Sequence, residues 1–341
     1  MRIERTRPWR GTTSVVSVVV PCYNYGHYLP QALDSILQQG VPVEVIIVDD
    51  CSTDDSAQVA AALSEQHPQV RLVRNEHNLG HIATYNTGLA MVTGEYVVLL
   101  SADDLLARGS LRRAIGLFDR HPAVGLVYGY AEPFTDVLPR VWNTGTTTIW
   151  GGSTWVDLVC HRGDNAIFNP EAIMRTSLLR SLGGGYDPSS PHAADMLLWL
   201  RAATIADVGR VNAVQGYYRT HAAQMHLTTF SGQIRDMHAR AEVYFALFGP
   251  EGTAPNPTRL GWGLRSIERE AAWLATLARC SGQEDERQEY VRAVEEITPG
   301  RRSSLLWRLG PGPRPRVGRL LDVVYSLKWN LKSRRWRWLG I

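Results

Sequence analysis

The chain has 341 residues, of which 44% are hydrophobic and 20% charged, so it can bury a sizeable core and is not disordered as a whole. No apolar run approaches the roughly 18–20 residues that span a bilayer. The four cysteines are scattered without a C-x-x-C pair, which disfavours a disulfide framework or a zinc site and fits a reducing cytoplasm.

The charge is unevenly distributed. Residues 301–341 contain 11 Lys or Arg and a single acid, whereas the preceding 300 residues contain 25 basic and 32 acidic residues. A net charge of +3 therefore combines an acidic body of −7 with a basic tail of +10.

The first 130 residues alternate between β-branched apolar runs and segments with helical spacing of apolar residues. The predicted strands are residues 15–20, 43–48, 70–73, 96–100 and 124–128. The predicted helices between them are residues 28–39, 54–66, 78–91 and 110–120. This alternation predicts an α/β fold, with a mostly parallel sheet flanked by helices.

The rest of the chain has a different texture. Residues 131–165 read as loops with an edge strand, and 170–182 and 192–204 read as helices. From about residue 231 apolar residues keep helical spacing, and a Pro- and Gly-rich breaker at 310–315 separates the tail. We therefore expect four parts. They are an N-terminal basic segment (1–13), an α/β domain (14–228), a helical C-terminal extension (229–300) and a basic Trp-rich tail (301–341).

Polar side chains follow several of the predicted strands. Tyr23 follows the first, Asp49 and Asp50 the second, and Asp103 and Asp104 the fourth. In a parallel sheet these positions meet at one edge, where ligands bind. Neighbouring carboxylates repel one another unless a cation lies between them, and oxygen ligands suit Mg²⁺ or Mn²⁺. The chain lacks the G-x-G-x-x-G and P-loop motifs, so a metal is the more plausible means of holding a diphosphate.

Nine short segments, in order, resemble the family 2 glycosyltransferases, which have the GT-A fold. The segments are 18–24 (VVVPCYN), 47–54 (IVDDCSTD), 78–80 (NLG), 86–88 (NTG), 94–96 (GEY), 101–104 (SADD), 183–187 (GGGYD), 195–201 (DMLLWLR) and 218–221 (YRTH). Each segment is weak alone, but together they cover about residues 14–225 at the family's spacing.

The resemblance implies a hexosyltransferase-like enzyme that inverts the anomeric carbon as it moves a sugar from a nucleoside diphosphate sugar to a hydroxyl. The acceptor would be a glycan, a lipid-linked sugar or a small molecule, as in the synthesis of cell-surface polysaccharides or glycosylated metabolites. The residues that would bind the donor are Pro21, Tyr23, Asp50, Asp103 and His221.

The family's motifs also assign roles to individual side chains. Tyr23 would pack on the nucleobase, and Asp50 would accept a hydrogen bond from a ring N–H, which favours UDP or dTDP. A Mg²⁺ or Mn²⁺ ion would bind Asp103, supported by Asp104 and reached by His221. Asp195 would be the catalytic base.

Three positions depart from the family's pattern. Ser101 stands where the metal motif usually has its first acid, Ala194 stands where a Glu usually precedes Asp195, and Tyr85 replaces a common Arg. These departures leave open a non-catalytic relative that binds a nucleotide sugar or a partner. A nucleotidyltransferase is disfavoured, because it needs a Gly-rich basic loop after the first strand.

Structural roles compete with some of these assignments. Asp49 suits a helix cap, and Asp195 is also an ordinary acid at a helix N-terminus. Three tryptophans in the domain suit either sugar stacking or core packing: Trp150, Trp155 and Trp199.

The tail has an amphipathic pattern over residues 316–341. An apolar helical face is flanked by Arg and Lys, and is formed by Val317, Leu320, Leu321, Val324, Leu327 and Leu331. Such a helix binds anionic membranes, or docks on an acidic protein surface or a second subunit. Nucleic acid is disfavoured, since no nucleic-acid module accompanies the tail. We expect a cytoplasmic protein that can bind the inner face of the cell membrane.

Overall fold

The structure is a computed structural model that describes residues 1–6, 11, 13–140, 142–221 and 232–299. It divides into two compact units. Unit 1 comprises residues 1–156 and 167–224, and unit 2 comprises 157–166 and 225–341. The predicted tail, 301–341, lies outside the described residues.

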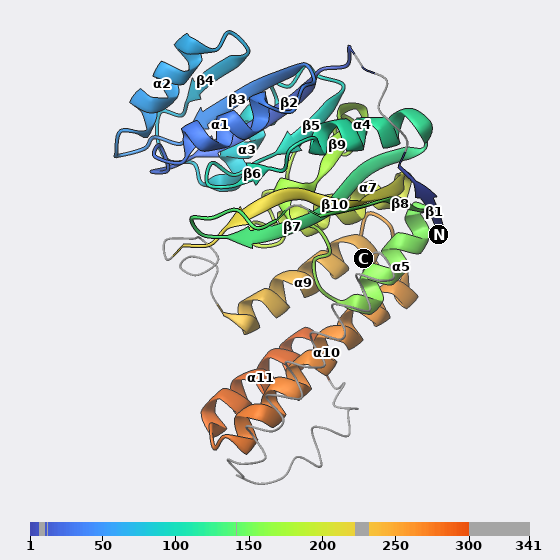
Figure 1. Ribbon diagram of the computed structural model, residues 1–341. Coiled ribbons are helices and arrows are strands. Elements are labelled where there is room, and N and C mark those ends of the chain that lie inside the picture. Colours follow the sequence, from blue (N-terminus) through green and yellow to red (C-terminus); the bar gives the residue numbers. More distant parts are fainter. Residues whose placement is uncertain (7–10, 12, 141, 222–231, 300–341) are drawn as a thin grey trace. The chain divides into compact units, whose positions relative to one another are not determined.

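Unit 1 contains one large mixed sheet (Figure 1). Its strands are β1 (Arg2–Arg5), β2 (Val16–Cys22), β3 (Val43–Asp49), β4 (Val70–Arg74), β5 (Tyr96–Leu99), β6 (Leu105–Leu106), β7 (Val124–Phe134), β8 (Asn143–Trp150), β9 (Ile173–Arg175) and β10 (Asp207–Arg219). The order is β1-β8-β10-β7-β9-β5-β2-β3-β4, with β6 paired to β10. Strands β2 to β5 are parallel, while β9 runs antiparallel to both β5 and β7.

The parallel strands are connected by helices in the predicted order. The helices of unit 1 are α1 (Leu29–Leu37), α2 (Ser56–Gln66), α3 (His81–Leu89), α4 (Ser110–Arg120), α6 (Thr176–Ser181) and α7 (Ala194–Ile205), with a short 3₁₀ helix, η1 (Asn169–Glu171), and the first part of α5 (Gly152–Arg162). Alternate valines of β2, such as Val16 and Val18, share a core with apolar residues of α1 and α4. The predicted α/β alternation of the first 130 residues is confirmed.

Helix α3 packs closely on the other face of the sheet, to which Val19 and Val48 point. A Cβ at Gly88 would lie 2.4 Å from Val19 Cγ1 and 3.0 Å from Val48 Cγ2. Only glycine therefore lets this helix reach the sheet at that turn.

The chain order places a switch point in the strand order beside β2. The connections through α1 and α2 lead from β2 to β3 to β4, and the connection through α3 then returns to β5 on the other side of β2. Ligands bind outside the carboxyl ends of strands at such a switch point. We call the line where β2, β3, β5 and β10 end the carboxyl edge, and the opposite line the amino edge.

The sequence-based prediction is wrong in the later part of unit 1. Residues 170–182, predicted as one helix, form η1, strand β9 and helix α6 instead. The prediction failed because Ile173 and Met174 suit either state, and pairing with Val98 and Val97 of β5 selects the strand. Residues 131–165 are also more regular than expected, since they contain the end of β7, β8 and α5.

Unit 2 is helical, as the apolar spacing from residue 231 predicted. It contains α9 (Gln233–Phe248), α10 (Pro257–Cys280) and α11 (Glu284–Ile297), with residues 157–166. The Arg240 guanidinium is buried and donates to the Gly163 carbonyl at 2.6 Å and to Glu270 at 3.0 Å. No helix in the described part of the chain combines the length and apolarity that crossing a membrane requires.

Candidate functional site

Two loops at the carboxyl edge are joined by hydrogen bonds through a left-handed asparagine. Asn24 has a φ of 58°, and so does Cys51 in the neighbouring loop. The Asn24 backbone N–H donates to Ser52 Oγ at 3.0 Å, and its side-chain oxygen accepts from the Thr53 N–H at 2.8 Å. Left-handed residues that are not glycine are uncommon and concentrate at functional sites. This bracing holds Pro21 and Tyr23 at the edge, where the Tyr23 side chain is exposed.

Asp50 lies at the same edge, but its carboxylate is largely engaged. It accepts from Asn75 Nδ2 at 2.8 Å, from the Leu79 N–H at 2.8 Å and from the Gly80 N–H at 2.9 Å. A carboxylate has about four acceptor positions, so one position remains for a donor group of a ligand. Asp50 thus fixes the turn that leads into α3, whatever else it binds.

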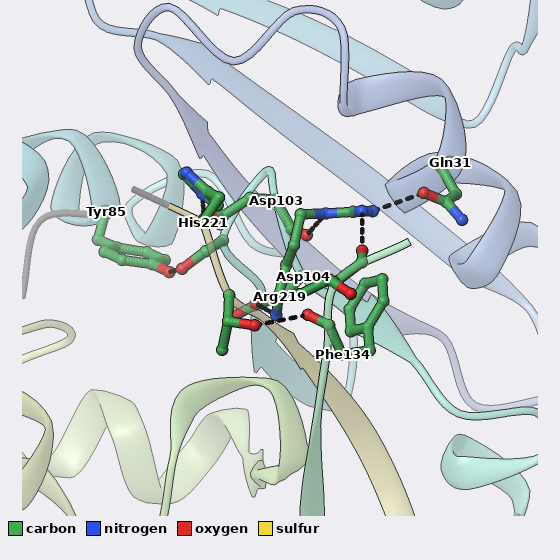
Figure 2. Close-up of polar contacts among 10 residues, drawn as sticks. Gln31, Tyr85, Asp103, Asp104, Phe134, Arg219 and His221 are labelled. Carbon is green, nitrogen blue, oxygen red and sulfur yellow. Dashed lines mark hydrogen bonds and ion pairs between the residues drawn. The ribbon is translucent and has the colours of Figure 1, made fainter. Parts of the chain in front are cut away.

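Asp103, Asp104 and His221 are brought together at the switch point (Figure 2). Asp103 Oδ2 lies 3.0 Å from His221 Nε2, and Asp104 Oδ1 accepts from the Arg219 N–H at 3.0 Å. The His221 ring is 5.4 Å from the rings of both Tyr25 and Tyr28. Residues more than 100 positions apart in the sequence therefore form one cluster, because β10 ends beside the loop that follows β5.

The two acids of this cluster differ in their surroundings. Burial raises the pKa of Asp104 well above its usual range, and the neighbouring Asp103 raises it further, while Arg219 lowers it. At Asp104, burial and the charge of Asp103 together outweigh the stabilisation that Arg219 gives to the carboxylate.

Arg219 is the central residue of this region, and sequence reasoning gave it no role. Its Nε donates to the Asp103 carbonyl at 2.8 Å, Nη1 to the Thr135 carbonyl at 3.0 Å and Nη2 to Gln31 Oε1 at 2.5 Å (Figure 2). The guanidinium lies 4.5 Å from the Tyr28 ring centroid and 4.4 Å from that of Phe134. The sequence feature that could have indicated a role for Arg219 is its position two residues before His221 in the YRTH segment.

Asp195 lies in the first turn of α7 and is linked to the cluster through aromatic side chains. Its Oδ1 accepts from the Met196 N–H at 2.7 Å. Burial raises the pKa of the Tyr186 phenol well above its usual range, and the neighbouring Tyr85 and the charge of Asp195 raise it further. The Tyr186 ring is 5.4 Å from that of Tyr85, whose hydroxyl is 3.3 Å from Ser101 Oγ.

Asp103 and His221 suit a divalent cation as a pair of ligands. Within the residues that the structure describes, no group of three His, Cys, Asp or Glu side chains could hold a metal by itself. An oxygen and an imidazole nitrogen at 3.0 Å supply two ligands, and Mg²⁺ typically takes its remaining ligands from water and phosphates. Asp104 lies behind them, with its carboxylate bonded to the Arg219 backbone.

The three tryptophans that the sequence left open between stacking and packing are buried in unit 1. Trp150, Trp155 and Trp199 are each at most 2% exposed. Their rings therefore pack in the core.

Comparison with known proteins identifies the domain. The model of glycosyl transferase family 2 matches residues 17–177. An uncharacterised protein of Mycobacterium tuberculosis is 28% identical over 291 residues, which is 82% of this chain and 89% of that protein. An uncharacterised glycosyltransferase of Nostoc is 38% identical over 114 residues, but this match covers only 33% of this chain and 35% of that protein.

Solved structures share the fold. Staphylococcus aureus TarS 1–349 in complex with UDP-GlcNAc superimposes with a TM-score of 0.62 at 19% identity, covering 83% of this chain and 80% of that one. A mannosyltransferase from Pyrobaculum calidifontis in complex with GDP-Man and Mn²⁺ gives a TM-score of 0.54 at 20% identity, covering 86% and 91%. The predicted GT-A-like fold is confirmed.

Proposed function

Because the chain belongs to glycosyl transferase family 2 and is a glycosyltransferase, we propose a specific reaction for it. It transfers a sugar, with inversion, from a nucleoside diphosphate sugar to a hydroxyl. The observation that carries the proposal is the contact between Asp103 Oδ2 and His221 Nε2 at the switch point of the sheet. It gathers, at the place where this fold binds ligands, the groups that a diphosphate and its cation need.

The reaction that we propose requires one proton acceptor. The acceptor oxygen forms a bond to the anomeric carbon as the bond from that carbon to the diphosphate breaks, and the Asp195 carboxylate takes the hydroxyl proton. The nucleoside diphosphate leaves with the bonding electrons. Asp195 is the one acid of its motif, since Ala194 precedes it.

A divalent cation would bind between Asp103 and His221, supported by Asp104. When bound, it would stabilise the negative charge that develops on the departing diphosphate. The residues of the chain prepare this position, because Arg219 fixes both the Asp103 backbone and the Asp104 carboxylate.

The donor's base would lie against the loops at the ends of β2 and β3. Tyr23 offers an exposed ring for stacking, and Asp50 retains one acceptor position for a ring N–H, which favours UDP or dTDP. Thermal shift with Mn²⁺ and UDP, dTDP, GDP or ADP sugars tests this assignment, because ligand binding raises the unfolding temperature by mass action. A larger shift with GDP or ADP sugars would contradict it.

Replacement of the proposed base tests the function. We expect metal-dependent release of nucleoside diphosphate, measured over a panel of donor sugars, to fall about 10³-fold or more in Asp195→Asn. Asp119→Asn makes the same chemical change at an exposed position near the C-terminal end of α4, and should retain full activity. Donor binding without turnover by the unaltered chain, with every metal and acceptor, would instead support a binding protein.

We also propose that the parts outside the α/β domain localise the enzyme. The basic residues 316–341 would bind an anionic membrane surface, which is consistent with their amphipathic pattern. Liposome flotation of the full chain and of a chain ending at residue 310 tests this idea. Equal recovery of both chains with anionic vesicles would exclude it.

A further inference from the structure

We infer that Phe168 forms a binding surface for the acceptor, on which the apolar face of a pyranose ring stacks. This inference rests on the proposed function, and it identifies the acceptor as a sugar. Phe168 is 54% exposed and is the second residue of segment 167–224 of unit 1. Exposed aromatic rings are the exception in a folded domain, where Phe is mostly buried.

Strand direction places Phe168 at the carboxyl edge. Because β9 runs antiparallel to β5, with Ile173 opposite Val98, the residues that precede β9 continue past the end at which β5 leads into Ser101. Helix η1 packs against β5, β7 and β10 in this position. Phe168, the residue before η1, therefore lies at the carboxyl edge, as the acidic cluster does.

The backbone of Phe168 is fixed while its ring is exposed. Its N–H donates to Glu171 Oε1 at 3.1 Å, and the Glu171 side chain is buried. The next residue, Asn169, accepts from the Tyr186 hydroxyl at 2.9 Å. A ring on such a fixed support loses little conformational freedom when it binds a ligand.

Two neighbours place Phe168 between the metal ligands and the proposed base. On one side its ring centroid is 6.0 Å from that of Tyr218, the residue before Arg219. Burial raises the pKa of the Tyr218 phenol, and the charges of Asp104 and Asp103 raise it further. On the other side Asn169 accepts from the Tyr186 hydroxyl, and the charge of Asp195 contributes to the raised pKa of that phenol.

An acceptor must reach the region between the proposed metal ligands and Asp195, because its hydroxyl attacks beside the diphosphate and transfers its proton to Asp195. A pyranose ring has an apolar C–H face and a rim of hydroxyls, so it can cover a phenyl ring while its hydroxyls face the acids. The hydroxyls of a sugar can donate hydrogen bonds to these carboxylates, whereas a purely apolar ligand would exclude water from them and offer no donor, which is unfavourable. The combination of an exposed ring and adjacent carboxylates therefore favours a sugar.

Kinetics separate this acceptor role from a donor role. With methyl pyranosides as acceptor probes, Phe168→Ala should raise the acceptor KM about tenfold, as expected for loss of roughly half of a buried Phe contact. The donor KM and the release of nucleoside diphosphate without acceptor should stay within about twofold, and Phe168→Trp should restore acceptor binding. Phe245→Ala, at a 42% exposed ring on α9, is the matched control and should change nothing.

A binding measurement keeps the inference independent of turnover. Saturation-transfer NMR of the full chain with UDP and Mn²⁺ should show the ring C–H protons of a methyl pyranoside in contact with the protein, and this signal should be lost in Phe168→Ala. Loss of the signal would support the inference even if the unaltered chain showed no transfer, a result that would contradict the proposed function alone. An unchanged acceptor KM or NMR signal in Phe168→Ala, or a rise in the donor KM instead, would overturn it.

Discussion

The two edges of the parallel sheet hold carboxylates in opposite environments. At the amino edge, Glu44 accepts hydrogen bonds from Ser17 Oγ, from the Thr93 N–H at 2.6 Å and from Thr93 Oγ1 at 2.8 Å. At the carboxyl edge, Asp103 and Asp104 are adjacent to each other, and Arg219 and His221 face them. The first edge surrounds one acid with donors, whereas the second concentrates acids.

The pKa shifts record this difference. Burial alone would raise the pKa of Glu44, but the hydrogen bonds from Ser17 and Thr93 outweigh it, and the pKa is lowered. The pKa of Asp104 is raised, since burial and the charge of Asp103 outweigh Arg219. An acid that the fold already satisfies stabilises the protein, whereas acids left partly uncompensated are suited to bind a cation. Substitutions at the two edges should therefore separate stability from activity.

The largest effect should follow from Asp103→Asn at the carboxyl edge. Removal of the charge that we propose holds a cation should lower metal-dependent turnover by about 10³-fold, which corresponds to several kcal/mol of transition-state stabilisation. The unfolding temperature without metal should stay the same or rise, because one of two adjacent buried carboxylates is neutralised. Nucleoside diphosphate release and thermal denaturation of the same preparations measure both quantities.

An unfolding temperature that falls together with activity would contradict the comparison. It would mean that Asp103 stabilises the fold in the way that Glu44 does. Loss of the additional thermal shift produced by Mn²⁺ with UDP should accompany the loss of turnover.

Arg219→Lys should reduce both stability and activity, because this residue belongs to the fold and the site at once. Lysine keeps the charge but loses the planar fork that serves the Asp103 carbonyl, the Thr135 carbonyl and Gln31. We expect the free energy of unfolding to fall by about 2–3 kcal/mol and the concentration of Mn²⁺ needed for half-maximal rate to increase. Urea denaturation and a metal titration of the rate measure the two effects.

Gln31→Ala provides the matched control for that experiment. It removes one hydrogen bond of the guanidinium and leaves the contacts to Asp103 and Asp104 intact. Its metal dependence should equal that of the unaltered chain. A shifted metal dependence in Gln31→Ala would show that Arg219 acts only through general stability.

The parallel half of the fold was predictable from the sequence, because its signals are local. Runs such as 15–20 and 43–48 are apolar throughout, as buried parallel strands are, and the helices between them have the correct spacing. Strand β9 was not predictable, because Ile173 and Met174 carry no strand signal apart from the neighbours that they pair with. No strand was predicted over residues 207–219, which form the long strand β10.

Recognition of the site residues depended on motifs, and their contacts required the structure. The sequence indicated Asp103, Asp104 and His221, but a separation of 118 positions along the chain hides the contact of Asp103 with His221 at 3.0 Å. No pattern indicated that Arg219 binds the backbone of one acid and faces the side chain of the other, or that the Phe168 ring is exposed while three tryptophans are buried. These properties depend on long-range packing.

Glu44→Gln tests the amino edge and should affect stability alone. A glutamine retains one acceptor oxygen but presents an NH₂ group to donors that need acceptors, so the free energy of unfolding should fall by about 1–2 kcal/mol. Turnover per folded molecule should not change. Glu65→Gln, at an exposed position of α2, should change stability by less than about 0.5 kcal/mol. A loss of turnover in Glu44→Gln at temperatures where the protein is folded would show that the two edges are coupled.

The smallest expected effect is the pH dependence of the stability that Glu44→Gln loses. The folded-state pKa of Glu44 is lowered, so its charged form stabilises the fold above the unfolded-state pKa of about 4.3, and this contribution disappears as the pH falls through the folded value. The difference in unfolding free energy between the unaltered chain and Glu44→Gln should be constant from neutral pH down to about 5.5 and should then decrease. Urea denaturation in steps of half a pH unit measures the difference. A difference that grows on acidification would mean that the hydrogen bonds favour the protonated Glu44, and that the amino edge resembles the carboxyl edge after all.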